Sequence, residues 1–124
     1  MSYDLYVNQK ETMPKSITRT YSRYSRDAAA LLGALIREAR NERKLSAQEL
    51  ADRGGISRGL LQRIEKGNLK CEIGAVFEVA TIVGVKLFDA DESMLTNYLH
   101  QTREKLALLP KSVRKKSKPV RDDF

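Results

Sequence analysis

The chain has 124 residues, of which 41% are hydrophobic, and a formal net charge of +7 from 23 Lys and Arg against 16 Asp and Glu. This length suits one compact domain with tails. The sequence has no run of the 18 to 20 or so apolar residues that a membrane span requires, and its N-terminus lacks a secretory pattern. The single cysteine cannot form an internal disulfide. We therefore expect a cytoplasmic protein with no membrane contact.

Basic residues are unevenly distributed along the chain. They are in excess over residues 1–69 and again over residues 110–124, whereas residues 70–109 carry a slight acidic excess. Such an asymmetry is typical of a surface that attracts phosphate groups. A solvated basic surface without a partner would look the same, so charge alone favours nucleic acid only slightly.

Residues 1–24 are expected to form an N-terminal arm, either flexible or packed back on the body through its tyrosines. Four of the five tyrosines lie in it: Tyr3, Tyr6, Tyr21 and Tyr24. Pro14 argues against a helix through its middle. From about residue 25 to residue 43, apolar residues recur at intervals of three and four, which predicts a helix with one buried face. That face consists of Ala28, Leu31, Leu32, Leu35, Ile36 and Ala39.

Four further helices follow in the sequence pattern. Ser46 and Glu49 form a capping box that predicts a second helix, ended by Gly54 and Gly55. Ser57 is expected to cap a third helix, which stops at Gly67. The fourth and fifth predicted helices have their apolar residues at about 73–83 and 94–106, and the fifth ends before Pro110. The sequence thus predicts an all-α fold with five helices over residues 25–109, between the arm and a flexible basic tail of residues 110–124.

The second and third predicted helices have the spacing of a helix-turn-helix over residues 45–67. Ala51 is small where the two helix axes must approach, and Gly55 permits the reversal of the chain. Leu61 and Ile64 point inward, as does Ile56 in the turn. The outer face of the third helix collects hydrogen-bond donors and small residues, which a purely structural helix pair does not need. The pattern therefore predicts a reader of the DNA major groove.

The candidate base-reading residues lie at the beginning of the third helix. Arg58 can form a bidentate pair with guanine, and Gln62, one turn later, can read adenine. Gly59 lets the backbone approach the bases, and Ser57 is a candidate for a phosphate or a base edge. Arg63 either contacts DNA or forms a salt bridge with Glu65 or a neighbour. The candidate phosphate contacts, which position the protein on DNA, are Ser46, Gln48, Lys66, Asn68 and Lys70.

Three segments resemble the Cro/repressor-type (XRE) helix-turn-helix regulators: residues 45–51 (LSAQELA), 55–58 (GISR) and 63–67 (RIEKG). With the fourth helix, the resemblance covers about residues 28–88. It implies a compact five-helix domain whose third helix enters the major groove, and a homodimer that reads a palindromic operator in double-stranded DNA. Two positions depart from the family pattern. Ala47 replaces a glutamine that often steadies a phosphate, and Gly54 replaces an apolar residue, which is expected to loosen the turn.

The last predicted helix carries an apolar stripe that serves a dimer or another partner, or that packs on the first helix of its own chain. Its residues are Met94, Leu95, Tyr98, Leu99 and Leu106. The sequence does not separate these alternatives.

Further segments, mainly in the C-terminal region, resemble one subgroup of these regulators. Residues 106–110 (LALLP), the basic run after them and residues 122–124, with residues 70–74 and 77–80, are similar to HipB-like antitoxins encoded beside HipA-type kinase toxins. This implies an antitoxin that represses its own operon and contacts a serine/threonine kinase toxin. Our hypothesis is that the tail or the acidic segment of residues 70–109 helps to hold this partner. The alternatives are a stand-alone phage or metabolic repressor, a helix-turn-helix scaffold for protein interaction, and a tail that only adds non-specific affinity for DNA.

No catalytic or metal site is expected. His100 is the only histidine and Cys71 the only cysteine, so these residue types provide neither a metal cluster nor a nucleophile with its base. Gly54 and Gly55 lack the spacing and the lysine of a phosphate-binding loop. The sequence predicts no enzymatic activity and no cofactor.

Overall fold

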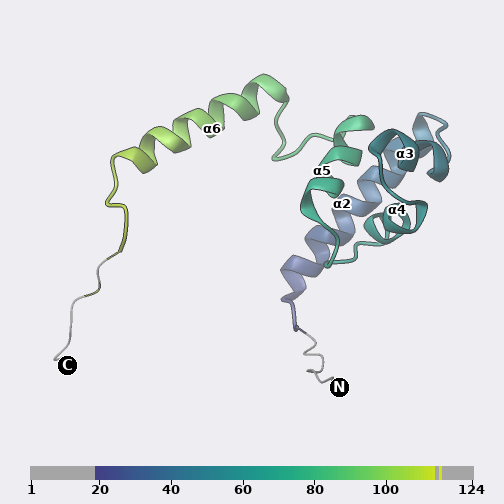
Figure 1. Cartoon of the computed structure of the whole chain (residues 1–124), viewed down its shortest axis with the longest axis horizontal. Coiled ribbons are helices and arrows are strands. Elements are labelled where there is room, and N and C mark those ends of the chain that lie inside the picture. The colour runs from purple at the N-terminus through teal and green to yellow at the C-terminus, as the bar shows by residue number, and fades with distance from the viewer. Residues whose placement is uncertain (1–18, 114, 116–124) are drawn as a thin grey trace, which may run out of the picture.

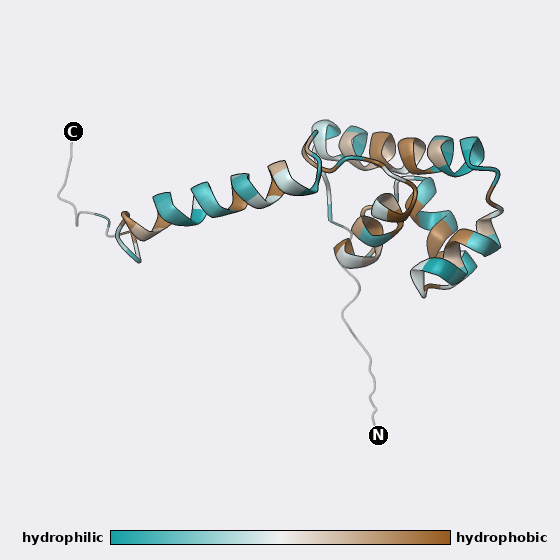
Figure 2. Ribbon diagram, turned by 90° about the horizontal axis from the view of Figure 1, so that it is seen from above, coloured by the Kyte–Doolittle hydropathy of each residue, from teal (hydrophilic) through white to brown (hydrophobic). Residues whose placement is uncertain are grey.

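The computed structural model describes residues 19–113 and 115, and the regular structure in this part of the chain is helical (Figure 1). The helices are α2 (Arg23–Glu42), α3 (Ala47–Gly54), α4 (Arg58–Glu65), α5 (Ile73–Ile82) and α6 (Glu92–Ala107). The first four form a compact body, and α6 projects away from it (Figures 1 and 2). The expected all-α fold with five helices is confirmed. Predictions that concern Tyr3, Tyr6, Pro14 and residues 122–124 fall outside the described residues.

Helix α2 begins earlier than the sequence pattern suggested. Ser22 is its N-cap and its hydroxyl oxygen accepts a hydrogen bond from the amide of Ser25 at 3.1 Å. A serine cap satisfies one of the amides that have no acceptor at the start of a helix. The predicted arm of residues 1–24 therefore overlaps the first turn of α2.

The apolar face predicted for α2 is confirmed in part, because Ile36 is buried and Leu32 and Ala39 pack against the core. Gly33 and Ile36 are buried against α4, and a Cβ on Gly33 would clash with the backbone carbonyl oxygen of Ile64. This close approach sets the contact on the Gly33 side of the helix. Leu31 and Leu35 were expected in the core but are 61% and 38% exposed. The helix orientation that this contact sets leaves both side chains uncovered.

Helices α3 and α4 form the predicted pair around the predicted turn. Ala51 and Leu61 are fully buried, and Ile64 is 3% exposed. Gly55 has a φ of 67°, in the left-handed region that favours glycine. Gly54 lies inside α3, where a Cβ would come within 2.9 Å of the side chain of Val79. We expected Gly54 to loosen the turn, but the structure gives it a different consequence, a close approach of α3 to α5.

Helix α5 closes the core of the body. It packs against α3, and the sequence anticipates this because the segment is apolar along most of its length. The buried hydrophobic cluster comprises Ile36, Leu50, Ala51, Leu61, Ile64, Ala75, Val79, Ala80 and Val83. One continuous core therefore holds α2, α3, α4 and α5 together.

A tight connection joins α5 to α6. Leu87 and Ala90 form an isolated antiparallel bridge, and Ala90 is 5% exposed. Between them, Phe88 and Asp89 adopt φ values of 56° and 50°. Asp91 then caps α6, which has no buried residue. Across the described ranges, no helix is both long enough and apolar enough to cross a membrane.

Candidate nucleic-acid interface

A polar cleft of about 320 Å³ lies where α4 passes α2 and the start of α3. It brings three of the predicted DNA-binding residues together, Arg58, Gln62 and Lys66. The residues that line it are Arg37, Arg40, Ala47, Arg58, Gln62, Glu65 and Lys66. Helix α2 contributes two of these side chains, Arg37 and Arg40.

Arg40 and Glu65 form an ion pair at the base of this cleft. Arg40 Nε donates to Glu65 Oε2 at 2.7 Å, and its second terminal nitrogen, Nη2, donates to Oε1 at 3.0 Å. The side chains are only 11% and 8% exposed. The hydrogen bond with Glu65 raises the pKa of Arg40 above its ordinary value, so the guanidinium stays charged and the two charges offset each other.

Because Glu65 is bound to Arg40, it leaves the other cations of the cleft without an acidic partner. Among the described residues the ion pairs are Arg40–Glu65 and His100–Glu104. Arg37, Arg58 and Lys66 are exposed, and none of the three is in either of these ion pairs. A recess lined by several unpaired cations attracts phosphate groups.

The beginning of α4 presents the predicted base-reading side chains to solvent. Arg58 is the first residue of α4, and Arg58 and Gln62 are both exposed. Ser57 is the N-cap, and its hydroxyl oxygen accepts a hydrogen bond from the amide of Leu60 at 3.0 Å. A Cβ on Gly59 would make only ordinary contacts, the nearest at 3.8 Å from Arg63. The fold itself therefore does not require glycine at position 59.

The start of α3 forms the predicted capping box. The Ser46 hydroxyl oxygen accepts from the amide of Glu49 at 3.0 Å, and the Glu49 carboxylate accepts from the amide of Ser46 at 2.8 Å. The hydrogen bond from the Ser46 amide to the carboxylate lowers the pKa of Glu49. The amides of Ala47 and Gln48 have no acceptor within the helix because of their position, and Ala47 lines the cleft. The start of α3, with these two free amides, therefore borders the cleft.

Other predicted contact residues are engaged elsewhere. The side-chain amide of Gln48 donates to Asp52 Oδ1 at 2.9 Å. Asn68 Oδ1 accepts from the backbone amide of Lys70 at 2.7 Å, and Asn68 lines a different groove, between α2 and α5. The alternative in which Arg63 pairs with Glu65 is wrong, because Arg40 binds that carboxylate on both oxygens.

Sequence reasoning missed Arg37 as a candidate phosphate ligand. It lies three residues before Arg40, so the two side chains share one side of α2, and both line the cleft. That spacing was visible in the sequence. Only the packing of α2 against α4 shows that this side of the helix adjoins the predicted base-reading residues.

Residues 36–87 match the family model for helix-turn-helix proteins of the Cro/C1 type. The match begins at Ile36 within α2 and ends at Leu87, just after α5, so it contains the whole cleft-forming part of α3 and α4. The chain carries a Cro/C1-type helix-turn-helix domain. Domains of this family are non-enzymatic, bind DNA sequence-specifically and regulate transcription.

The family match does not include α6 or the C-terminal tail. No curated protein and no solved structure matches the chain. In the part of the chain that the structure describes, no group of three or more His, Cys, Asp or Glu side chains is placed to hold a metal ion. Of the comparisons, the match of residues 36–87 is therefore the one that bears on function.

Proposed function

We propose that the chain is a transcriptional repressor that binds a palindromic operator as a homodimer, with α4 in the major groove. The observation that carries this proposal is the cleft in which Arg58 and Gln62 lie beside unpaired cations. Donors at the start of an exposed helix suit base edges, and flanking cations suit the phosphates on either side.

The two kinds of contact have different consequences for binding. Arg58 and Gln62 would distinguish guanine and adenine in the major groove. Arg37 and Lys66 would bind phosphates, together with Lys70 and the amides at the start of α3. Phosphate contacts hold the helix in register and contribute affinity for every sequence, whereas the base contacts select one.

The homodimer is supported by the surface of α6. Met94, Tyr98 and Leu99 are 39%, 47% and 49% exposed, and Leu95 is half-buried. Exposed apolar side chains in one stripe are typical of an interaction surface. A dimer would also place two α4 helices on successive major grooves and so double the length of sequence that is read.

Selection of binding sites from a pool of random duplexes tests this function. We expect enrichment of a palindrome whose half-sites lie about one helical turn, roughly 34–36 Å, apart, and a dimer in sedimentation of the free protein. Binding that shows no sequence preference above its salt-dependent attraction for all duplexes would contradict the proposal. That result would favour the scaffold alternative.

We further propose that this repressor is the antitoxin of a kinase toxin and represses its own operon. The support is the similarity of residues 106–110 and the basic run after them to HipB-like antitoxins. In addition, the chain just after α6 exposes apolar side chains to a partner, since Leu108 and Leu109 are 87% and 59% exposed.

Co-purification with the product of the neighbouring gene tests the antitoxin proposal. We expect a stable complex with a serine/threonine kinase, and weaker complex formation after truncation at Lys111. The same truncation is expected to leave the preferred operator sequence unchanged. If no neighbouring kinase binds, the protein is a stand-alone repressor, and the DNA-binding proposal is unaffected.

A further inference from the structure

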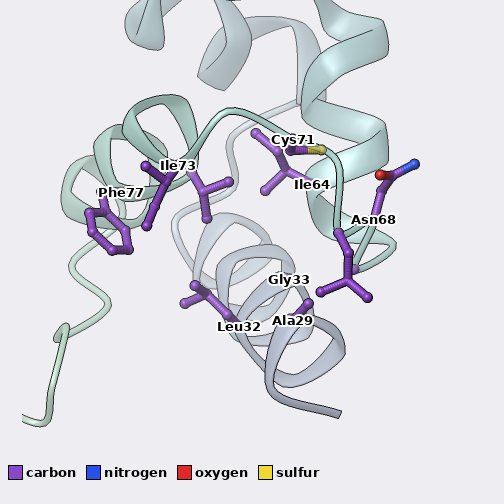
Figure 3. Close-up of a pocket in the computed structure, with 11 residues that line it drawn as sticks. Ala29, Leu32, Gly33, Ile64, Asn68, Cys71, Ile73 and Phe77 are labelled. Atoms are coloured by element: carbon purple, nitrogen blue, oxygen red, sulfur yellow. The ribbon is translucent and has the colours of Figure 1, made fainter. Parts of the chain in front are cut away.

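An apolar groove of about 270 Å³ lies between α2 and α5, on a part of the body that shares no residue with the polar cleft (Figure 3). Leu32 of α2 lies on one side of it, and Ile73 and Phe77 of α5 lie on the other (Figure 3). Its lining residues are Ala29, Leu32, Gly33, Ile64, Gly67, Asn68, Leu69, Cys71, Ile73, Val76 and Phe77. We call this the α2–α5 groove.

The α2–α5 groove suits apolar side chains better than a small polar ligand. Its volume is below the range of about 300–1,000 Å³ that small-molecule sites occupy, and such sites place several polar groups around the ligand. Asn68 is the one amide side chain in the lining, and its oxygen already accepts a hydrogen bond from Lys70. The groove therefore offers almost nothing but hydrophobic contact.

The apolar surface continues from the groove along α2. Leu35 lies three residues after Leu32 and four after Leu31, so the three side chains are neighbours on the helix surface. Leu31 is 61% exposed, and Ile73 on the opposite side of the groove is 67% exposed. The groove and this stripe together form an elongated apolar surface, which suits a helix better than a single side chain.

Helix α6 has a length and an apolar side that suit this elongated apolar surface. Its 16 residues span about 24 Å at 1.5 Å per residue. Leu95, Leu99 and Leu106 follow one another at intervals of four and seven, so they share one side of the helix. No residue of α6 is buried, and α6 projects away from the body (Figure 2).

The connection between α5 and α6 keeps the helix away from the groove of its own chain. The bridge between Leu87 and Ala90 and the burial of Ala90 anchor this turn to the body, and Asp91 caps α6 directly after it. The anchored turn directs α6 outward (Figure 1). An α6 that folded back on its own body would have to disrupt these contacts, whereas the α6 of a second copy would not.

Pairing of two α6 helices with each other would form a weaker dimer contact than docking in the groove. A two-helix coiled coil needs about three to four heptads of apolar positions to be sustained, and 16 residues provide little more than two. The groove and the α2 stripe supply the additional apolar surface that such a pair lacks.

We propose that α6 of each copy docks in the α2–α5 groove of a second copy, so that the dimer forms by reciprocal exchange of α6. This inference rests on the homodimer of the proposed function and specifies its interface. The exchange buries the same two surfaces twice, as a two-fold symmetric dimer requires. Both polar clefts remain free for DNA because they share no residue with the grooves.

Disulfide trapping tests the exchange, because the single cysteine, Cys71, lies in the groove lining. The variants Leu95→Cys, Leu99→Cys and Leu106→Cys are oxidised one at a time. We expect at least one of them to form a covalent dimer whose disulfide joins the new cysteine to Cys71 of the other chain. The control Gln101→Cys, which lies on another side of α6, is expected to remain unlinked.

Mixed samples separate exchange from the competing arrangements. Leu99→Cys with Cys71→Ser on one chain, mixed with the unmodified chain, should yield a crosslinked heterodimer. A disulfide within one chain would show that α6 folds back on its own body, and would overturn the proposal. A dimer linked through position 99 of both chains in the Cys71→Ser background would overturn it in favour of paired α6 helices. A sample without crosslinks at any of the three positions would also overturn it.

A charge test gives a second readout without cysteine chemistry. Ile73→Glu and Leu99→Glu each place a carboxylate in the proposed interface at an exposed site, so the folding of the body should be unaffected. Each is expected to raise the dimer dissociation constant by about tenfold or more in sedimentation. Unchanged dimerisation of Ile73→Glu would contradict the exchange but not the homodimer. A wild-type chain that is monomeric but selects a specific operator would contradict both dimer proposals and leave DNA binding standing.

Discussion

Arg40 of α2 and Glu65, the last residue of α4, are 25 positions apart in the chain and bind each other through two hydrogen bonds of 2.7 and 3.0 Å. A further nitrogen of Arg40, Nη1, donates to the carbonyl oxygen of Leu45 at 3.0 Å. One guanidinium thus joins α2, the chain before α3 and the end of α4. This contact links the end of α4, the helix that we propose reads DNA, to α2 and to the chain before α3.

Loss of one partner of this ion pair should destabilise the domain. Arg40→Ala leaves the Glu65 carboxylate without its cation at a position that is 8% exposed, and we expect the free energy of unfolding to fall by about 2 to 3 kcal/mol. Urea denaturation measures it. The double variant Arg40→Met/Glu65→Met removes both charges and should lose less than Arg40→Ala. A single variant as stable as the wild type would show that the pair has no structural role.

Gly59→Ala should separate stability from DNA recognition. A methyl group at position 59 meets only ordinary contacts in the free protein, and alanine favours the helical conformation by roughly 0.5–1 kcal/mol. We expect a higher free energy of unfolding and specific DNA binding weakened by about fivefold or more, since the methyl group would lie against the bases. Thermal unfolding and a gel shift on the selected operator measure the two effects. Unweakened binding would show that the backbone of α4 does not approach the DNA closely at this position.

Protonation of Asp91, the N-cap residue of α6, should weaken the start of this helix at acidic pH. The amide of Met94 at 2.9 Å and the hydroxyl of Ser93 at 3.0 Å donate to Asp91 Oδ1 and hold the pKa of Asp91 below its ordinary value of 3.8. A carboxylate whose pKa is lowered by folding stabilises the folded state above the unfolded pKa, and this contribution is lost as pH falls through the folded pKa. Helix content is therefore expected to hold from neutral pH down to about pH 4 and to decrease below it.

Asp91→Asn is the matched control for the acid titration. Asparagine also caps helices but does not ionise, so the variant should lose less helix content than the wild type as the pH falls below the ordinary aspartate pKa. Far-ultraviolet circular dichroism at a series of pH values measures the difference. Identical curves for the two proteins would show that Asp91 does not contribute to the acid response.

The sequence predicted the local features of the fold well, because short-range chemistry determines them. The capping box at Ser46 and Glu49 and the left-handed glycine at position 55 were both expected, and both are present. The inward positions Leu61 and Ile64 also follow from helical spacing alone. Each of these features depends on residues within one turn of helix, so the pattern of the chain is sufficient to place them.

The features that the sequence missed depend on how distant elements pack. The apolar face predicted for α2 included Leu31 and Leu35, which the structure leaves exposed because the close contact at Gly33 sets the orientation of the helix. The sequence also predicted only part of the cleft. Arg58 and Gln62 follow from their place on α4, whereas Arg37 joins them only because α2 crosses beside α4.

The specificity ratio of Arg58→Ala tests most directly whether α4 reads DNA. The ratio compares binding of the selected operator with binding of a random duplex of the same length, and Lys70→Ala is the control. We predict that Arg58→Ala loses about 1–3 kcal/mol of affinity for the operator and little for the random duplex. Lys70→Ala should weaken both alike and reduce the salt slope by about one unit. A specificity ratio unchanged by Arg58→Ala would contradict the assignment of α4 as the reader.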